Sequence, residues 1–140
     1  VLKANMKVVG NCEYGLILYR QKLPKFRNNG KMIFNCIDWP RDTEKEKIHP
    51  TQKPVKLLER LIELFTDEGD VVIDPVAGSG STLVAAERLN RKAYGFEIKK
   101  EFYMKANEWL ASERQAIEDI KKHGYAKRKI EKSAPILFND

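Results

Sequence analysis

The 140-residue sequence predicts an α/β fold in which helices cover part of a doubly wound parallel sheet. Three observations indicate this fold. Apolar residues recur at helical spacing over residues 55–65, a short apolar strand follows at 71–74, and a second strand is predicted at 93–98. A glycine loop and a helix separate the two strands, an order that is typical of a βαβ unit.

The elements expected before this unit are shorter. Residues 13–20 are rich in β-forming and apolar residues and predict a strand. Residues 24–30 contain proline, asparagine and glycine and predict a polar, basic loop. Residues 32–37 predict a second short strand, and residues 40–47 are charged and predict a loop.

Three helices are expected in the rest of the chain. Pro54 opens the first, where its missing N–H costs nothing, and Gly69 follows its end. The second covers residues 82–89 and has apolar residues on one side. The third runs from Glu101 to about Gly124, and the remainder of the chain is basic and weakly patterned.

Charge divides the sequence into three regions. Residues 1–56 hold 12 basic and 5 acidic residues, whereas residues 57–100 hold 6 and 8, so the net charge of +6 is concentrated at the front. We expect a strand-containing basic region at 1–47, a ligand-binding core at 48–123 and a basic tail at 124–140. The basic excess favours a nucleic-acid partner, and a solvated surface that keeps the chain soluble is the alternative.

Composition excludes several classes of protein. No apolar run approaches the roughly 18 residues of a transmembrane helix, so we expect no contact with a membrane. Two cysteines and two histidines do not match a disulfide-rich scaffold or a zinc centre, so we expect a reducing, cytoplasmic location and no metal. The first residue is Val1 and no leader follows it, and we therefore expect the chain to be a piece of a longer protein.

The loop between the two strands carries the functional signal. Gly78-Ser79-Gly80 opens a helix, as in a nucleotide-binding turn, but Leu83 stands where the third glycine of a dinucleotide fingerprint would be. Glu97 follows Gly78 by 19 residues, where an acid accepts hydrogen bonds from ribose. Asp74 would pair with an ammonium group and repel a pyrophosphate. Together they favour S-adenosylmethionine, although a turn acid and an ordinary strand-end charge remain the alternatives.

Three motifs resemble the amino-group DNA methyltransferases, the bacterial and phage enzymes that methylate adenine N6 or cytosine N4. They are His-Pro-Thr-Gln-Lys-Pro-Val at 49–55, Asp-Pro-Val-Ala-Gly-Ser-Gly-Ser-Thr at 74–82 and Gly-Phe-Glu-Ile at 95–98. Their order is similar to that of the permuted group, in which the catalytic half precedes the cofactor half. The resemblance implies a partial Rossmann-like S-adenosylmethionine-dependent methyltransferase fold that lacks its catalytic strands.

The resemblance also implies a role for each matching residue. Asp74 would meet the methionine amino group, Thr51 and Lys53 would hold its carboxylate, and Glu97 would bind the ribose. Val76 stands where the family usually has phenylalanine, which removes an aromatic wall but no hydrogen bond. The cofactor-binding residues expected are Thr51, Lys53, Asp74, Pro75, Ala77, Gly78, Ser79, Gly80, Ser81, Thr82, Glu97, and Phe96 and Ile98 on either side of the adenine ring.

The catalytic motif of the family is absent from the sequence. That motif is a polar residue, two adjacent prolines and an aromatic residue, and no two of the six prolines here are adjacent. The polar side chain and a backbone carbonyl would aim the target amine, and the aromatic residue would stack on the flipped base. We therefore expect no catalytic residue in this chain and place the motif upstream of Val1.

The sequence thus predicts the cofactor-binding half of a DNA methyltransferase, with adenine N6 as the favoured target and cytosine N4 as the alternative. A non-catalytic cofactor- or DNA-binding subunit of a split enzyme and a degenerate structural module remain open. The expected partners are double-stranded DNA and a missing N-terminal catalytic half or partner chain, and a homodimer is also open. Candidate phosphate contacts are Lys22, Lys25, Arg27 and Lys31.

Overall fold

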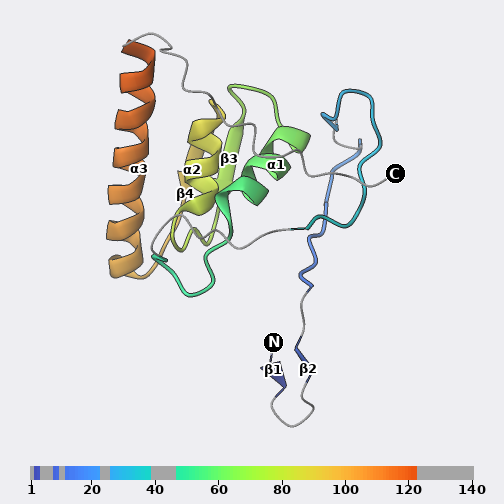
Figure 1. Cartoon of the computed structure of the whole chain (residues 1–140), viewed down its shortest axis with the longest axis horizontal. Coiled ribbons are helices and arrows are strands. Elements are labelled where there is room, and N and C mark those ends of the chain that lie inside the picture. The colour runs from blue at the N-terminus through green and yellow to red at the C-terminus, as the bar shows by residue number, and fades with distance from the viewer. Residues whose placement is uncertain (1, 4–7, 10–11, 23–25, 39–46, 123–140) are drawn as a thin grey trace.

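The described chain contains a parallel two-stranded sheet, a small antiparallel pair and three helices (Figure 1). The structure, a computed structural model, describes residues 2–3, 8–9, 12–22, 26–38 and 47–122. In chain order the elements are β1 (Leu2–Lys3), β2 (Val8–Val9), α1 (Val55–Phe65), β3 (Val71–Asp74), α2 (Ser81–Arg88), β4 (Lys92–Gly95) and α3 (Lys100–Lys122).

The predicted βαβ unit is confirmed. β3 and β4 pair in parallel, with Val71 opposite Lys92 and Asp74 opposite Gly95, and α2 connects them. The expectation that the second strand reaches residue 98 is wrong, because β4 ends at Gly95. After Asp74 the chain turns across the end of the sheet, and the N–H of Ala77 donates to the carbonyl of Phe96 at 2.8 Å. Residues beyond β4 are therefore bonded to the glycine loop.

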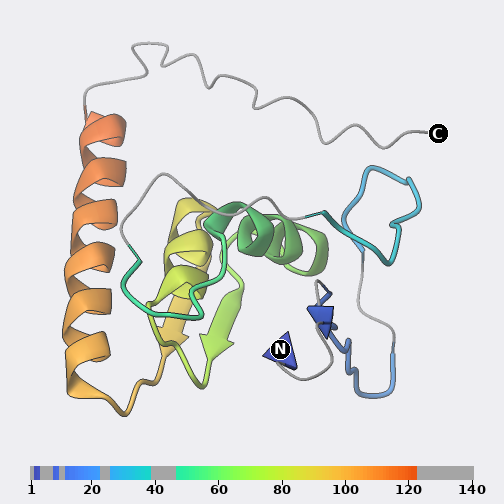
Figure 2. The ribbon, with the colours of Figure 1, turned by 60° about the horizontal axis from the view of Figure 1, so that its bottom comes forward.

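The three helices pack on one another with α2 in the middle. In both ribbon views α2 lies between α1 and α3 (Figures 1 and 2), and residues 84–86 of α2 are fully buried. Val55 and Ile62 of α1 and Trp109 of α3 belong to the same buried cluster. The apolar helix predicted from residue 55 is confirmed, and so is the long helix that follows β4. Its predicted end near Gly124 lies outside the described residues.

One face of the parallel sheet is not covered by the described residues. Val72 and Ala93 pack against the helical core, whereas the side chains of Val71 and Ile73 are 51% and 61% exposed. Successive side chains of a strand point to opposite faces, so the helices cover only every second residue. The apolar strand predicted at 71–74 is therefore covered by the described residues on one face only, and the face that carries Val71 and Ile73 is open.

The strands predicted at 13–20 and 32–37 are wrong, because neither segment forms a strand. Tyr14, Leu16 and Leu18 are instead between 86% and 94% exposed. A β-strand requires a neighbouring strand to accept and donate its backbone hydrogen bonds. In the described ranges the parallel sheet consists of β3 and β4 alone, so the β-forming segments at 13–20 and 32–37 have no described strand to pair with.

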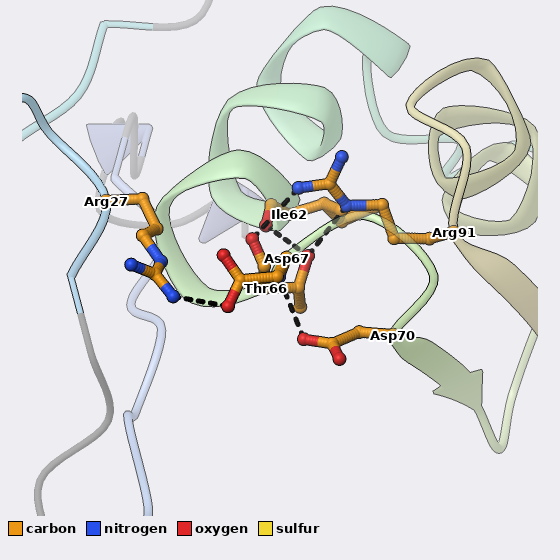
Figure 3. Close-up of polar contacts among 6 residues, drawn as sticks. All are labelled: Arg27, Ile62, Thr66, Asp67, Asp70 and Arg91. Carbon is orange, nitrogen blue, oxygen red and sulfur yellow. Dashed lines mark hydrogen bonds and ion pairs between the residues drawn. The ribbon is translucent and has the colours of Figure 1, made fainter.

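The basic loop after residue 25 docks on the C-terminal end of α1 (Figure 3). The backbone N–H of Arg27 donates to the carbonyl of Leu64 at 2.8 Å, and its guanidinium forms an ion pair with Asp67. From the other side, Arg91 donates to the Thr66 carbonyl at 2.9 Å and to its hydroxyl at 3.0 Å. These contacts tie the loop and the start of β4 to the turn that precedes β3.

Candidate functional site

A cleft of about 220 Å³ opens beyond the carboxyl ends of β3 and β4, between the loop 48–53 and the glycine loop. Ligands of open parallel sheets bind at this edge, because the loops that leave the strands meet there. The residues that line the cleft are His49, Thr51, Gln52, Lys53, Asp74, Val76, Ala77, Gly78, Ser79, Ser81, Thr82 and Glu97.

The glycine loop joins β3 to α2 through two residues with left-handed backbone. Gly78 has φ 53° and Gly80 has φ 80°, and a side chain is strained in this region. Gly80 precedes the first residue of α2, and a Cβ atom there would lie 3.1 Å from the Cβ of Ala106 in α3. The loop therefore turns sharply where α3 approaches, and it presents the amino end of α2 to the cleft. The unpaired N–H groups of that end favour anionic ligand atoms.

Glu97 connects the two loops at the end of the sheet. Its Oε2 atom accepts the backbone N–H of Gly78 at 2.9 Å, and its Oε1 atom accepts that of Lys99 at 2.8 Å. The hydrogen bond from Lys99, with a further one from Gly78, lowers the pKa of the Glu97 carboxyl despite a smaller opposing effect of desolvation. Each oxygen keeps a second lone pair, so the ionised carboxylate can accept further hydrogen bonds from a ligand.

Asp74 serves the turn and also lines the cleft. Its Oδ1 atom accepts the N–H of Val76 at 3.0 Å, which closes the turn after β3. This is the turn-acid arrangement that the sequence left open as an alternative. The same carboxylate nevertheless borders the cleft together with Gly78 and Glu97. The turn role of Asp74 is therefore compatible with a role in binding a ligand.

The loop 48–53 forms the opposite wall. The N–H of Gln52 donates to the His49 carbonyl at 3.0 Å, and the Ile48 N–H donates to the Gln52 side chain at 3.1 Å, so the loop is a closed turn. The ammonium of Lys53 forms an ion pair with Glu13, with a separation of 2.6 Å. This pair links the segment that begins at residue 12 to the wall of the cleft.

The structure brings most of the expected cofactor residues to one place. Of the thirteen expected, nine line the cleft and four do not: Pro75, Gly80, Phe96 and Ile98. Phe96 is 66% exposed and Ile98 is fully exposed. Sequence reasoning assigned no role to His49 or Gln52, although both lie within the motif at 49–55. That motif was the signal that could have found them.

The candidate DNA-contact residues have different surroundings. Lys22 and Lys31 are exposed, whereas Arg27 is paired with Asp67, and Lys25 lies outside the described residues. Within the described part of the chain, no group of three or more histidine, cysteine, aspartate or glutamate residues is arranged to hold a metal ion. The helices of that part are too short or too polar to cross a membrane.

Comparison with known proteins assigns the family. The profile of the N6/N4 methyltransferase family, described as DNA methylase, matches residues 13–108. The Type II methyltransferase M2.DpnII of Streptococcus pneumoniae is 40% identical over 100 residues, which are 69% of this chain and 37% of that protein. The DNA adenine methyltransferase YhdJ of Escherichia coli is 41% identical over 90 residues, which are 62% of this chain and 31% of that protein. The chain thus spans less than half of either relative.

A solved structure agrees with this assignment. The complex of M1.HpyAVI with SAM superimposes with a TM-score of 0.56 at 33% identity, over 65% of this chain and 46% of that one. The βαβ unit, the cleft at its carboxyl edge and the match over residues 13–108 point the same way. The chain belongs to the DNA methylase family of N6 and N4 methyltransferases.

Proposed function

We propose that this chain is the cofactor-binding part of an S-adenosylmethionine-dependent DNA methyltransferase that modifies an exocyclic base amine. The observation that carries the proposal is the meeting of Asp74, Gly78 and Glu97 around one cleft. Asp74 supplies an anion for an ammonium group, Gly78 lets the backbone come close to the ligand, and Glu97 supplies an acceptor for ribose hydroxyls. The SAM complex of M1.HpyAVI supports the choice of ligand.

The residues of the cleft fit the parts of this cofactor. Asp74 would bind the methionine ammonium, and the second lone pairs of the Glu97 oxygens would accept the ribose hydroxyls. Lys53 would hold the methionine carboxylate, since an ammonium has three donors and can bind Glu13 as well. When bound, the cofactor supplies a methyl group on a positively charged sulfur.

The cleft is too small to enclose the whole cofactor, so part of the cofactor would lie outside it. Pockets that enclose a whole ligand usually measure about 300–1,000 Å³, and this cleft measures about 220 Å³. The methionine tail and ribose would lie within it. The adenine ring would lie over the exposed side chains of Phe96 and Ile98 beside it, which would explain why these apolar groups face outward.

The target base in this proposal is adenine at N6. The name of the Escherichia coli relative, a DNA adenine methyltransferase, supports adenine, and cytosine N4 remains the alternative within the same family. The chain alone binds cofactor without transferring the methyl group, because the sequence has no adjacent prolines followed by an aromatic residue. Exposed Lys22 and Lys31 would contact the phosphates of double-stranded DNA.

Titration calorimetry with S-adenosylmethionine tests the binding step. The chain should bind, and Glu97→Ala should raise the Kd about tenfold or more through the lost ribose acceptors. Glu101→Ala, a change to an exposed acid outside the cleft, is the matched control and should leave the Kd unchanged. An unchanged Kd in Glu97→Ala, or no binding by the unmodified chain, would overturn the proposal.

Methyl transfer tests the chemistry. The purified chain with radiolabelled cofactor should leave DNA unlabelled, and labelled DNA would contradict the proposed absence of catalysis. Mass spectrometry of DNA from cells that express the complete reading frame should detect N6-methyladenine. Detection of N4-methylcytosine instead would establish the alternative target.

A further inference from the structure

The ring of His49 contacts three parts of the site at once. It meets the ring of Phe102 in α3 edge-on, with 4.4 Å between the ring centroids. A Cβ atom on Gly78 would lie 3.7 Å from the His49 ring, so the glycine loop passes directly beside it. On its own loop, His49 is hydrogen-bonded to Thr51. His49 is therefore the residue where both walls of the cleft and α3 meet.

The hydrogen bond to Thr51 defines the state of the ring. The backbone N–H of Thr51 lies 3.2 Å from His49 Nδ1, and the Thr51 hydroxyl lies 3.0 Å from the same atom. A backbone N–H can only donate, so Nδ1 must accept and carries no proton. This arrangement matches the neutral tautomer that carries its proton on Nε2.

We infer that His49 is a positioning residue, which in this neutral form holds Thr51 and Gly78 at the separation that the cofactor requires. The inference rests on the proposed function and concerns the same cleft. His49 reaches the cofactor through these neighbours: Nδ1 fixes the backbone of Thr51, and the ring, supported by Phe102, sets how close the glycine loop can come. Both Thr51 and Gly78 line the cleft.

Protonation gives a readout that loss of packing alone would not produce. A proton on Nδ1 would face the N–H of Thr51, and two donors would then oppose each other. Glu97, after β4, is close enough for its carboxyl to be affected by the charge of His49, and the ammonium of Lys99 lies 5.5 Å from the Phe102 ring. Lys53 and Asp74 line the same cleft. Because protonation would set two donors against each other at Nδ1, we expect the binding affinity to fall on acidification.

Two substitutions separate the acceptor from the ring. His49→Asn places an amide oxygen at the position of Nδ1 and removes the ring contact with Phe102. His49→Phe keeps a ring beside Phe102 and removes the acceptor. We expect His49→Phe to raise the Kd for S-adenosylmethionine about fivefold to tenfold, and His49→Asn to recover part of that loss.

The pH profile identifies the group. Between about pH 8 and about pH 5.5 the Kd of the unmodified chain should rise several-fold, whereas that of His49→Asn should stay level. His123→Asn, which removes the other histidine of the sequence, is the control and should keep the dependence of the unmodified chain. A dependence that survives in His49→Asn, or equal Kd values for both His49 variants and the unmodified chain, would overturn the inference.

Nitrogen NMR of the ligand-free chain tests the same arrangement without the cofactor. The His49 signals should report the Nε2–H form, and the Thr51 amide resonance should move with the titration of the ring. An Nδ1–H form, or a Thr51 amide indifferent to that titration, overturns the inference while calorimetry still detects binding. Absence of cofactor binding by the unmodified chain would overturn the proposed function and the inference with it.

Discussion

The carboxylate of Glu97 accepts a hydrogen bond from the backbone N–H of Gly78, which stands 19 positions earlier in the chain, at 2.9 Å. The bond joins the loop after β3 to the loop after β4, across the open edge of the sheet. The residue expected to bind a ribose therefore also holds the glycine loop in place. Changes at Glu97 should consequently alter both the loop and the ligand affinity.

Glu97→Gln should destabilise the chain in a manner that depends on pH. The pKa of Glu97 is lowered from its ordinary value of 4.5, chiefly by the hydrogen bond from the Lys99 N–H. An acid whose pKa is lowered by folding stabilises the fold at pH values above its ordinary pKa. This contribution is lost as the pH falls through the pKa of the folded state. The difference in Tm between the unmodified chain and Glu97→Gln should be constant above about pH 6 and shrink below about pH 4.5. A difference that grows on acidification would contradict this.

Gly95→Ala should destabilise the βαβ unit. A Cβ atom at this position would lie 2.7 Å from Leu83 Cδ1 and 3.0 Å from the Cβ of Ala77, so the buried Leu83 side chain would have to shift. We expect a loss of about 1–3 kcal/mol, the usual cost of overpacking, measured by urea unfolding. Gly15→Ala, with no atom within 4 Å, is the matched control and should leave the unfolding midpoint in place. Equal unfolding midpoints for Gly95→Ala and Gly15→Ala would contradict this, because they would mean that the Leu83 side chain moves aside without loss of stability.

Glu13→Gln should tighten the binding of S-adenosylmethionine. Glu13 pairs with Lys53 at 2.6 Å, and a methionine carboxylate would have to share that ammonium with a second negative charge. Removing the charge of Glu13 should lower the Kd about twofold to threefold at low salt, and less at high salt because ions screen exposed charges. Lys53→Met should raise the Kd in the same titration. Weaker binding by Glu13→Gln would show instead that Glu13 orients Lys53 for the ligand.

Lys22→Gln and Lys31→Gln should weaken DNA binding, whereas Arg27→Gln should not. Both lysines are exposed, while the guanidinium of Arg27 is already paired with Asp67. Each lost phosphate contact should reduce the slope of log affinity against log salt by about 0.9. Arg27→Gln should instead lower the stability by at most about 1 kcal/mol and keep the slope. A reduced slope in Arg27→Gln would mean that its guanidinium leaves Asp67 for DNA.

Elements whose signals lie within a short stretch of sequence were predicted correctly, whereas elements that need a distant partner were not. The helix at 55–65, the strand at 71–74 and the glycine loop were predicted because their signals lie within a few neighbouring residues. The strands expected at 13–20 and 32–37 were wrong, because β-forming residues become a strand only where another strand pairs with them. The spacing of 19 residues after Gly78 marked Glu97 as a candidate acceptor for a ribose, but its hydrogen bond with the Gly78 N–H was not predicted and is a finding of the structure.

The sequence by itself determined the βαβ order and the residues that line most of the cleft, since helical periodicity, a glycine turn and motif spacing act over short stretches. Only the tertiary structure decided which charges meet. Lys53 pairs with Glu13 and Arg27 with Asp67, each across 40 positions, and His49 packs on Phe102 of another element. No periodicity encodes such contacts. They depend on how the loops and helices close over one edge and one face of the sheet, and that closure also leaves Val71 and Ile73 exposed on the other face.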